Sequence, residues 1–567
     1  MFIQFRLQDI TCSRPPPVPK RFAYKTWYRI SKSIHPDPEL HNIGSYKSLH
    51  SVYVSELAQK DIDLTDIAFD PYSSSRGRWL DRDERRQRAR RQEFNFDALL
   101  DVAVKCSKGA HEVVSCEKRE GGFNRVFLIE FDNKAKVVAK VPMRAAGPAA
   151  LTTMSEVATL RYVKSKTRVP VPQVLAWSSR PESGTVGTEY VIMEHMSGVA
   201  LHDIWSQMTG VQHIELVSSV GELAKELCAL DFRAFGSLYF NASDKPAGAL
   251  PLDEEFCIGP HCGRHLWGYN DDQMAQTAVP LGLQGPWQDF SSYLADLTQI
   301  GEVTISQRGS PQALVEDHLR LLETSRKALE IVKNVTTDAS GPILFHPDLH
   351  ARNLFVDPND PTQIVGVIDS QSTAIEPAFV HAVETPDFAE EPLLDKTLDA
   401  DISHDQEMHD DARRCSTTWA VMVFLCPKLG KATALNHLLC CYLAGVSSGY
   451  SDDIASLRSL LADVSSEWEE LKIPSPCPYQ PSEEDVKLLS LEREHSQSTQ
   501  RLRAYLSRLL RCEMDGLVEN SRWDEVVPIY REQYAGFVRA CIASREEDET
   551  EEDAQKKADK LWPFEFR

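Results

Sequence analysis

Short apolar runs separated by turn residues characterise the chain from Phe94 onward. Val126–Ile129 and Val137–Ala139 are two of these runs, and the turn-forming residues Asp132 and Asn133 lie between them. Runs of this length that alternate with turns are typical of short strands joined by hairpins. The pattern therefore predicts a small mixed β-sheet in this part of the chain.

The following stretch has a helical period. Over residues 151–166 apolar side chains recur at near-helical spacing, and Pro170 and Pro172 then stop the pattern. A strand is predicted next, over Tyr190–Met193. The segment EHMSG that follows, residues 194–198, ends in a glycine and is interpreted as a connection between two lobes.

Helical periodicity dominates beyond residue 200, and the exception is the stretch Phe345–Ile368, where short apolar runs are bracketed by turns. A small sheet followed by a long helical region predicts an α+β fold with two lobes, residues 94–197 and 198–567. The clearest predicted helices are Val217–Leu230, Ala313–Val332, Asp411–Cys426 and Glu484–Cys512.

The length of 567 residues exceeds what one simple core supports, so two or more packed units are expected. Hydrophobic residues make up 42% and charged residues 26% of the chain, which is typical of folded soluble proteins. The net charge of -22 argues against a broad nucleic-acid surface, because phosphate backbones are bound through excess lysine and arginine. The 13 cysteines form no tight framework and indicate reduced thiols. No transmembrane segment is predicted, since no run approaches about 20 apolar residues.

Residues 1–35 contain a single acidic residue, Asp9, among several basic ones, a bias found in mitochondrial presequences. A proline run and the lack of an amphipathic helix leave open an untargeted disordered arm. Residues 36–93 form an extension with a charged run, Arg76–Glu93, that is predicted as an exposed helix. That run is interpreted as a solvated face, with binding to an acidic partner or membrane lipid as the alternative.

Residues 346–353 read HPDLHARN and satisfy the kinase catalytic-loop pattern H-x-D-L-x-x-x-N at every fixed position. About 0.004 chance matches are expected in a chain of this length. Asn353 directly precedes a short strand, and Asp369 directly follows another, with a turn sequence midway between them. An antiparallel hairpin therefore returns Asp369 to the end where Asn353 lies.

An amide oxygen and a carboxylate placed together suit Mg2+, which prefers a few hard oxygen ligands. We therefore predict Asn353 and Asp369 as metal ligands. Asp348 remains as the base that orients an attacking hydroxyl or accepts its proton. The alternative is a hairpin whose polar residues only cap turns.

The segment VVAK at residues 137–140 resembles the strand whose lysine contacts nucleotide phosphates, which makes Lys140 a candidate. Glu156 shares a helix face with apolar residues and is predicted to pair with Lys140. Taken alone, this lysine would be interpreted as a side chain reaching solvent from a sheet edge. Gly121 and Gly122 precede a strand, where main-chain amides can approach phosphates, although an ordinary hairpin turn explains them equally well.

These residues together resemble the aminoglycoside phosphotransferase-like kinases, and residues 68–567 are similar to a fungal group called altered inheritance of mitochondria protein 9. The resemblance includes the segments GRWL at 77–80, EGGFNRVF from 120, SEVATLRYV at 155–163, FGSLYF at 235–240 and GPW at 285–287. Relatives often place an aromatic residue where this chain has Ser370, a departure that concerns local packing more than chemistry.

The resemblance implies a protein-kinase-like bilobal fold that binds ATP between the lobes with Mg2+, and a mitochondrial location, with a cytoplasmic one as the alternative. Glu194 to Met196 would supply main-chain contacts to the adenine. The implied activity is phosphoryl transfer to the hydroxyl of a small molecule; a nucleotide-binding scaffold without activity and a kinase of protein substrates are the alternatives. The sequence identifies neither the acceptor nor the oligomeric state.

Two further groups of residues are weighed and set aside. Four residues, Cys257, His261, Cys262 and His265, lie close together without a standard zinc-ligand spacing, and packing or surface roles are favoured. His350 lies inside the catalytic-loop pattern, where contact with a phosphate or substrate and a structural hydrogen bond are equally supported, and it is left out of the predicted catalytic set.

Overall fold

A computed structural model describes residues 69–269, 279–307, 311–391, 402–447, 454–545 and 549–564, apart from the side chains of a few residues within them. The chain divides into two compact units. The larger unit contains Glu84–Leu489, and Gly77–Asp83 belongs with Ser490–Arg567 in the smaller one. The predicted presequence lies outside the described residues, and the predicted domain limits stay predictions.

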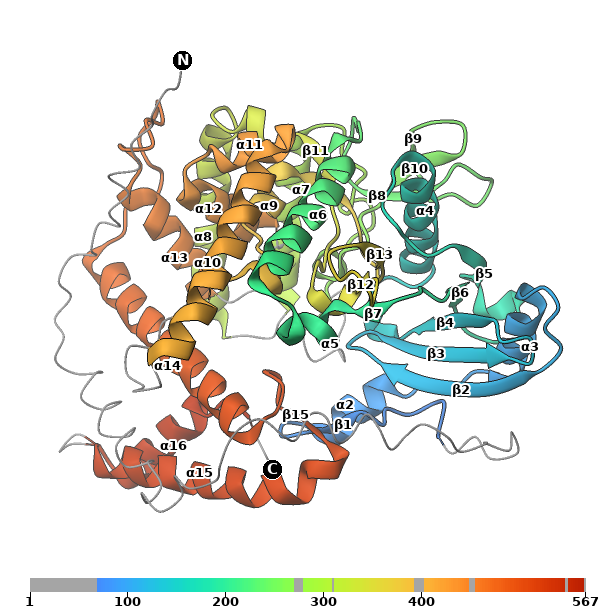
Figure 1. The fold of residues 1–567 in the computed structure, drawn as a ribbon. Coiled ribbons are helices and arrows are strands. Elements are labelled where there is room, and N and C mark those ends of the chain that lie inside the picture. The colour runs from blue at the N-terminus through green and yellow to red at the C-terminus, as the bar shows by residue number, and fades with distance from the viewer. Residues whose placement is uncertain are drawn as a thin grey trace. The chain divides into compact units, whose positions relative to one another are not determined.

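The larger unit begins with a sheet of five strands in the order β2-β3-β4-β6-β5 (Figure 1). Each strand pair in it is antiparallel, so the sheet is purely antiparallel and not mixed as predicted. Hairpin turns join β2 to β3 and β3 to β4, which enforces this direction. The strands are β2 (Val113–Glu120), β3 (Asn124–Phe131), β4 (Lys136–Pro142), β5 (Val174–Ser178) and β6 (Tyr190–Glu194).

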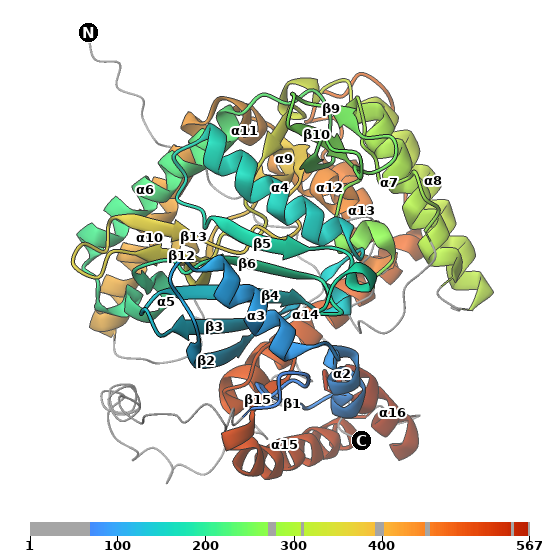
Figure 2. The ribbon, with the colours of Figure 1, turned by 90° about the vertical axis from the view of Figure 1, so that its right-hand side faces the viewer.

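Two helices, α3 (Phe96–Cys106) and α4 (Leu151–Lys166), pack against this sheet (Figure 2). Residues of β4 alternate between the two sides, as they must in a strand. Val137 and Ala139 join the apolar cluster of α3, whereas Val138 packs in the cluster of α4. The next residue on the α4 side of the sheet is Lys140.

Helix α4 has the limits predicted from the sequence, and most of its residues are buried. Val157 packs on β6, while Leu160 and Tyr162 belong to the large core of the helical region. Because α4 contacts apolar residues around much of its circumference, even Glu156 is buried.

The remainder of the larger unit is mainly helical, and the α+β class is confirmed. It contains three small sheets, ordered β8-β10-β9, β11-β14 and β13-β12-β7. Their strands are β7 (Val199–Ala200), β8 (Ser237–Phe240), β9 (Leu250–Pro251), β10 (Phe256–Gly259), β11 (Pro342–Leu344), β12 (Leu354–Val356), β13 (Ile364–Val367) and β14 (Ile375–Pro377). The helices are α5 (Leu201–Ile204), α6 (Gly210–Ala229), α7 (Phe290–Gln307), α8 (Gln312–Val332), α9 (Ala378–Ala382), α10 (Ile402–Leu425), α11 (Pro427–Thr433), α12 (His437–Ser447), α13 (Ile454–Ser466) and the start of α14 (Glu483–Leu510), which belongs to the smaller unit from Ser490 onward.

The smaller unit pairs two segments that are far apart in sequence. Strand β1 (Gly77–Trp79) runs antiparallel to β15 (Leu517–Glu519), and α15 (Trp523–Ala543) and α16 (Glu551–Leu561) contribute to its core. The predicted helix over residues 76–93 is therefore too long, because β1 occupies its start. Helix α2 is limited to Asp83–Arg90.

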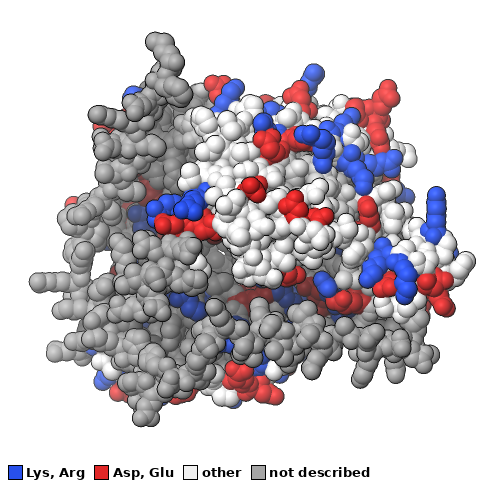
Figure 3. Space-filling model, in the orientation of Figure 1, with Lys and Arg blue, Asp and Glu red and all other residues white. Residues whose placement is uncertain are grey.

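Basic and acidic side chains are interspersed over the described part of the face drawn in Figure 3. Among the described helices, none combines the length and the apolar character needed to cross a membrane.

Candidate active site

Lys140 lies at the centre of the site, with 6% of its side chain exposed. Its ammonium is 2.7 Å from Glu156 Oε1 on α4 and 2.7 Å from Asp369 Oδ1, just after β13. The side-chain alternation of β4 turns the lysine toward α4, and Glu156 projects from the helix to meet it. The structure thus confirms the predicted contact between Lys140 and Glu156 and adds Asp369 to it.

The three charged groups shift one another's pKa. Burial acts to lower the pKa of Lys140, but the two carboxylates outweigh it and the pKa is raised. Burial acts to raise the pKa of Asp369, but the charge and hydrogen bond of Lys140 outweigh it and the pKa is lowered. Burial raises the pKa of Glu156 despite the attraction of Lys140, and Asp369 adds repulsion. Lys140 and Asp369 are therefore charged at neutral pH.

Asn353 and Asp369 lie at the same end of the β12–β13 hairpin, which confirms the predicted hairpin. Leu354 pairs with Val367, and the N–H of Ile368 donates to the carbonyl of Asn353 at 3.0 Å. Asp369 has a φ of +64°, a left-handed conformation that residues other than glycine seldom adopt. Backbone strain of this kind is concentrated at functional sites.

The Asn353 side-chain amide also holds Asp348. Its Nδ2 donates to the Asp348 carbonyl at 2.8 Å and to Asp348 Oδ2 at 2.9 Å. Because both contacts use the amide nitrogen, the amide oxygen is directed away from Asp348. This leaves Asn353 Oδ1 oriented for a different partner, such as a metal ion.

His346 fixes the start of the segment 346–353. Its Nδ1 accepts from the N–H of Asp348 at 3.2 Å, so its Nε2 carries the proton and donates to the Ile368 carbonyl at 2.9 Å. Burial lowers the pKa of His346 and favours this neutral form. The histidine therefore ties the Asp348 loop to the strand that ends at Asp369.

Gly121 and Gly122 form the turn between β2 and β3, where the N–H of Gly121 donates to the Asn124 carbonyl at 2.9 Å. A Cβ atom at Gly122 would meet no atom within 4 Å, so the chain itself does not crowd this position. An ion pair joins the two strands next to this turn. Arg125 is fully buried, and its Nε lies 3.0 Å from Glu120 Oε1. Sequence reasoning missed this buried ion pair, although both of its residues flank the glycines.

The segment from Glu194 to Gly198 connects β6 to β7 and so joins the five-stranded sheet to the sheet of β7, β12 and β13. The N–H of Glu194 donates to the Gln173 carbonyl at 2.8 Å. Met196 packs over Gly366, where a Cβ atom would come within 3.0 Å of its methyl carbon. Gly198 has a φ of +100°, and a Cβ atom there would lie 2.4 Å from the Val356 carbonyl oxygen. This close approach requires glycine at the end of the connection.

Three further contacts, made by Gln371 and His350, were not predicted. Gln371 donates from Nε2 to the Ala146 carbonyl at 3.1 Å and so links the segment after Asp369 to the region before α4. His350 lies 3.0 Å from Asp348 Oδ1 through Nε2 and 3.5 Å from Asp387 Oδ1 through Nδ1. The sequence carries no local signal for Asp387, because no periodic pattern defines its distance from residues 346–353.

Three of the four residues considered for zinc, Cys257, Cys262 and His261, have separate partners. Cys257 Sγ contacts the Phe240 carbonyl, and Cys262 Sγ lies 2.9 Å from the Tyr239 hydroxyl. His261 Nε2 is 3.0 Å from Glu376 Oε1. The arrangement supports the packing role favoured from the sequence.

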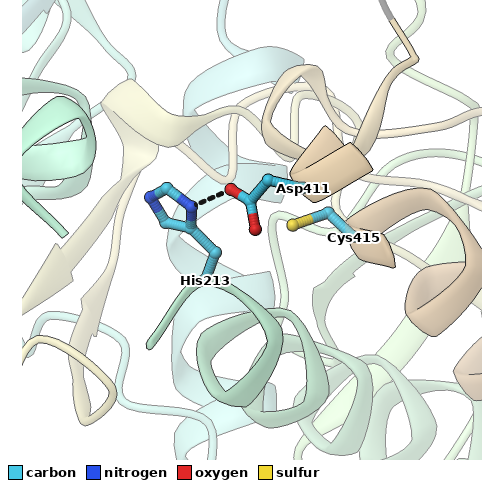
Figure 4. A group of neighbouring side chains, drawn as sticks. All are labelled: His213, Asp411 and Cys415. Carbon is cyan, nitrogen blue, oxygen red and sulfur yellow. Dashed lines mark hydrogen bonds and ion pairs between the residues drawn. The ribbon is translucent and has the colours of Figure 1, made fainter. Parts of the chain in front are cut away.

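Another group, His213 on α6 with Asp411 and Cys415 on α10, brings potential metal ligands within 4.8 Å of one another (Figure 4). His213 Nδ1 is 2.5 Å from Asp411 Oδ2, and Nε2 is 2.9 Å from the Trp205 carbonyl. Both ring nitrogens are thus engaged, and the Nδ1 contact is shorter than the separation of about 3 Å between two ligands of one zinc ion. Burial raises the pKa of Cys415 to about 11. The group is best explained as a polar contact that joins α6 to α10.

Comparison with known proteins adds independent information. Residues 116–379 match the model of the family described as "Phosphotransferase enzyme family". This range contains Lys140, Glu156, Asp348, Asn353 and Asp369.

Among curated proteins, a subtelomeric hrmA-associated cluster protein of Aspergillus fumigatus is 25% identical over 490 residues, 76% of this chain and 94% of the relative. The altered inheritance of mitochondria protein 9, mitochondrial, of Clavispora lusitaniae is 25% identical over 304 residues, 47% of this chain and 49% of the relative. Among solved structures, the streptomycin–ATP complex of APH(2'')-IIa is 15% identical with a TM-score of 0.37, covering 67% of this chain and 99% of the other.

Proposed function

We propose that the protein transfers the terminal phosphoryl group of ATP to a hydroxyl of a small molecule, because residues 116–379 match the model of the phosphotransferase enzyme family. The observation that carries this proposal is the position of Lys140, whose ammonium contacts Glu156 and Asp369 at 2.7 Å each. A buried lysine held by two carboxylates from different segments is the expected partner of nucleotide phosphates.

Lys140 would bind the phosphates of the nucleotide. Glu156, with 2% of its side chain exposed, holds the ammonium from the side of helix α4, so the lysine does not need a new rotamer when the nucleotide arrives. Pre-orientation of this kind lowers the entropic cost of binding. The turn at Gly121 and Gly122 would approach the phosphates with its main-chain amides, since no side chain of the turn's glycines obstructs them.

Asn353 and Asp369 fit a Mg2+ site. They offer an amide oxygen and a carboxylate at one end of a hairpin, the ligand types that this ion prefers. Asp369 keeps 39% of its side chain exposed while one oxygen contacts Lys140, so the carboxylate remains accessible. When bound, the ion would neutralise negative charge on the nucleotide phosphates.

Asp348 would act on the acceptor. As the hydroxyl oxygen bonds to the terminal phosphorus and the bond from phosphorus to the bridging oxygen breaks, ADP leaves and the hydroxyl proton passes to the Asp348 carboxylate. Asn353 Nδ2 holds one carboxylate oxygen at 2.9 Å and so limits rotation of the side chain. The base is thereby oriented before the acceptor binds.

The connection from Glu194 to Met196 would bind the adenine through its main chain. The N–H of Glu194 already donates to Gln173, so this residue would contribute its carbonyl. Met196 would contribute its own main-chain groups, and its side chain packs on Gly366.

The proposal is tested by incubating the protein and its Asp348→Asn variant with ATP labelled at the terminal phosphate, Mg2+ and a metabolite extract. A labelled small molecule formed by the wild-type chain and strongly reduced with the variant supports the proposed function. Nucleotide-dependent thermal stabilisation without labelled product would instead identify a nucleotide-binding scaffold. Labelled protein bands would point to a protein acceptor.

We also propose a mitochondrial location, because several of the curated relatives are named as mitochondrial proteins. Sequencing the N-terminus of the protein purified from cells tests this proposal, since removal of a presequence would expose a new terminus. An intact terminus together with cytoplasmic fractionation would overturn it.

A further inference from the structure

We infer that His350 is a positioning residue that holds the Asp348 carboxylate in the orientation that proton transfer requires. This inference rests on the proposed function, because it assigns a role relative to Asp348 as the base.

The two oxygens of Asp348 are held from two directions. Asn353 Nδ2 donates to Oδ2 at 2.9 Å, and His350 Nε2 lies 3.0 Å from Oδ1. The His350 N–H also donates to the Asp348 carbonyl at 2.9 Å, so the tight turn of the main chain brings the imidazole back over the carboxylate. With one contact on each oxygen, rotation of the carboxylate about its Cβ–Cγ bond breaks at least one of them.

His350 is itself supported from behind. Its Nδ1 is 3.5 Å from Asp387 Oδ1, and that oxygen accepts from the N–H groups of Ala351 and Phe388 at 2.9 Å each. Two main-chain donors from different segments keep the Asp387 carboxylate in place. The Asp387 carboxylate is fixed, and it restrains His350. His350 in turn restrains the Asp348 carboxylate.

The exposure of His350 and Asp348 indicates that their contact positions a side chain and does not stabilise the fold. About half of each side chain is exposed, 49% for His350 and 52% for Asp348. Contacts between exposed charged groups contribute little to the free energy of unfolding. Removing the imidazole should therefore change the geometry of Asp348 and leave the fold intact.

The kinetic test compares His350→Ala with His350→Gln, whose amide nitrogen can reach the carboxylate as Nε2 does. We expect His350→Ala to lower kcat about tenfold with KM for ATP within about twofold of wild type, because only the orientation of the base is lost. His350→Gln should recover most of this loss. His111→Ala is the matched control, since the contact of His111 with Asp132 uses its main-chain N–H. Wild-type kcat in His350→Ala would overturn the inference, as would an equal loss in His350→Ala and His350→Gln.

The structural test does not require activity. Crystal structures of the wild-type chain and of His350→Ala are compared at the Asp348 side chain. We expect one carboxylate orientation in the wild type and two or more in the variant, with the contact of Asn353 to Oδ2 partly lost. An unchanged single orientation would overturn the inference. If the wild-type chain transfers no phosphoryl group, the proposed function fails, and this comparison still decides whether His350 positions Asp348.

Discussion

The Lys140–Glu156 contact and the His350–Asp348 contact belong to one site and have similar lengths, 2.7 and 3.0 Å. Their surroundings differ. The first pair is almost fully buried, with 6% and 2% of the side chains exposed, whereas about half of each side chain in the second is exposed. A buried charge without a partner is costly, while an exposed charge is solvated by water. The first pair should therefore affect stability as well as nucleotide binding, and the second only the chemical step.

The largest effect is expected for Asp348→Asn. Loss of the base should lower turnover by about 10^2- to 10^4-fold, because asparagine cannot accept the hydroxyl proton. The free energy of unfolding should change by no more than about 0.5 kcal/mol, since the side chain is exposed. Labelled-ATP turnover and urea denaturation measure the two quantities. Unchanged turnover would remove Asp348 from the role of base, and a large loss of stability would contradict the comparison.

Lys140→Met, unlike Asp348→Asn, should strongly lower the free energy of unfolding. It leaves the buried Glu156 carboxylate without its cation, and we expect a loss of about 3 to 5 kcal/mol in the free energy of unfolding. Urea denaturation at pH 7 measures this loss, and nucleotide-dependent thermal stabilisation should disappear at the same time.

The double variant Lys140→Met with Glu156→Met is the control for that measurement. It removes both charges and fills the site with apolar side chains, so much of the lost stability should return. A double variant that is no more stable than Lys140→Met would show that the loss does not arise from an unpaired buried carboxylate.

The buried part of the site was the more predictable from sequence. The limits of α4 agree with the prediction because prolines end its apolar pattern, and Glu156 lies on the predicted face. The hairpin that returns Asp369 to Asn353 was predicted because turn residues stand midway between two apolar runs. In both cases, local periodicity and turn chemistry determine which side chains meet.

Other features depend on contacts between segments that share no local pattern. Strand β1 pairs with β15 about 440 residues later in the chain, and a strand of three residues leaves no periodic signal. The charged run that contains β1 was therefore predicted as one long helix. The support that Asp387 gives to His350 was missed for the same reason, because it depends on how two loops pack.

A second buried cluster extends the comparison to pH. Burial acts to lower the pKa of His381, but Glu376 and Glu384 outweigh it and raise the pKa to about 9, from the ordinary histidine value of about 6.5. The stability contributed by this histidine is fully present below pH 6.5 and is lost as the pH rises through about 9. Glu376 has a lowered pKa, so its own contribution stays present above pH 4.5, throughout the range of the experiment.

We therefore expect His381→Gln to be less stable than the wild type by about 2 to 3 kcal/mol more at pH 6 than at pH 9.5. Urea denaturation at both pH values measures the difference, and each variant acts as its own control. A stability difference that does not vary with pH would show that His381 is not held in its charged form by the two carboxylates.

The smallest effect on the free energy of unfolding is expected for an exposed ion pair outside the site, Arg180–Asp244. Arg180 Nη2 lies 3.0 Å from Asp244 Oδ2, with 56% and 40% of the side chains exposed. Asp244→Asn keeps the size of the side chain and removes its charge, and the free energy of unfolding should change by no more than about 0.5 kcal/mol because water and salt screen the pair. Urea denaturation under the conditions used for Lys140→Met places the two values on one scale. A loss above about 1 kcal/mol would mean that the exposed Arg180–Asp244 pair, with an ordinary length of 3.0 Å, contributes to the free energy of unfolding. Burial would then not govern which charged contacts stabilise this fold.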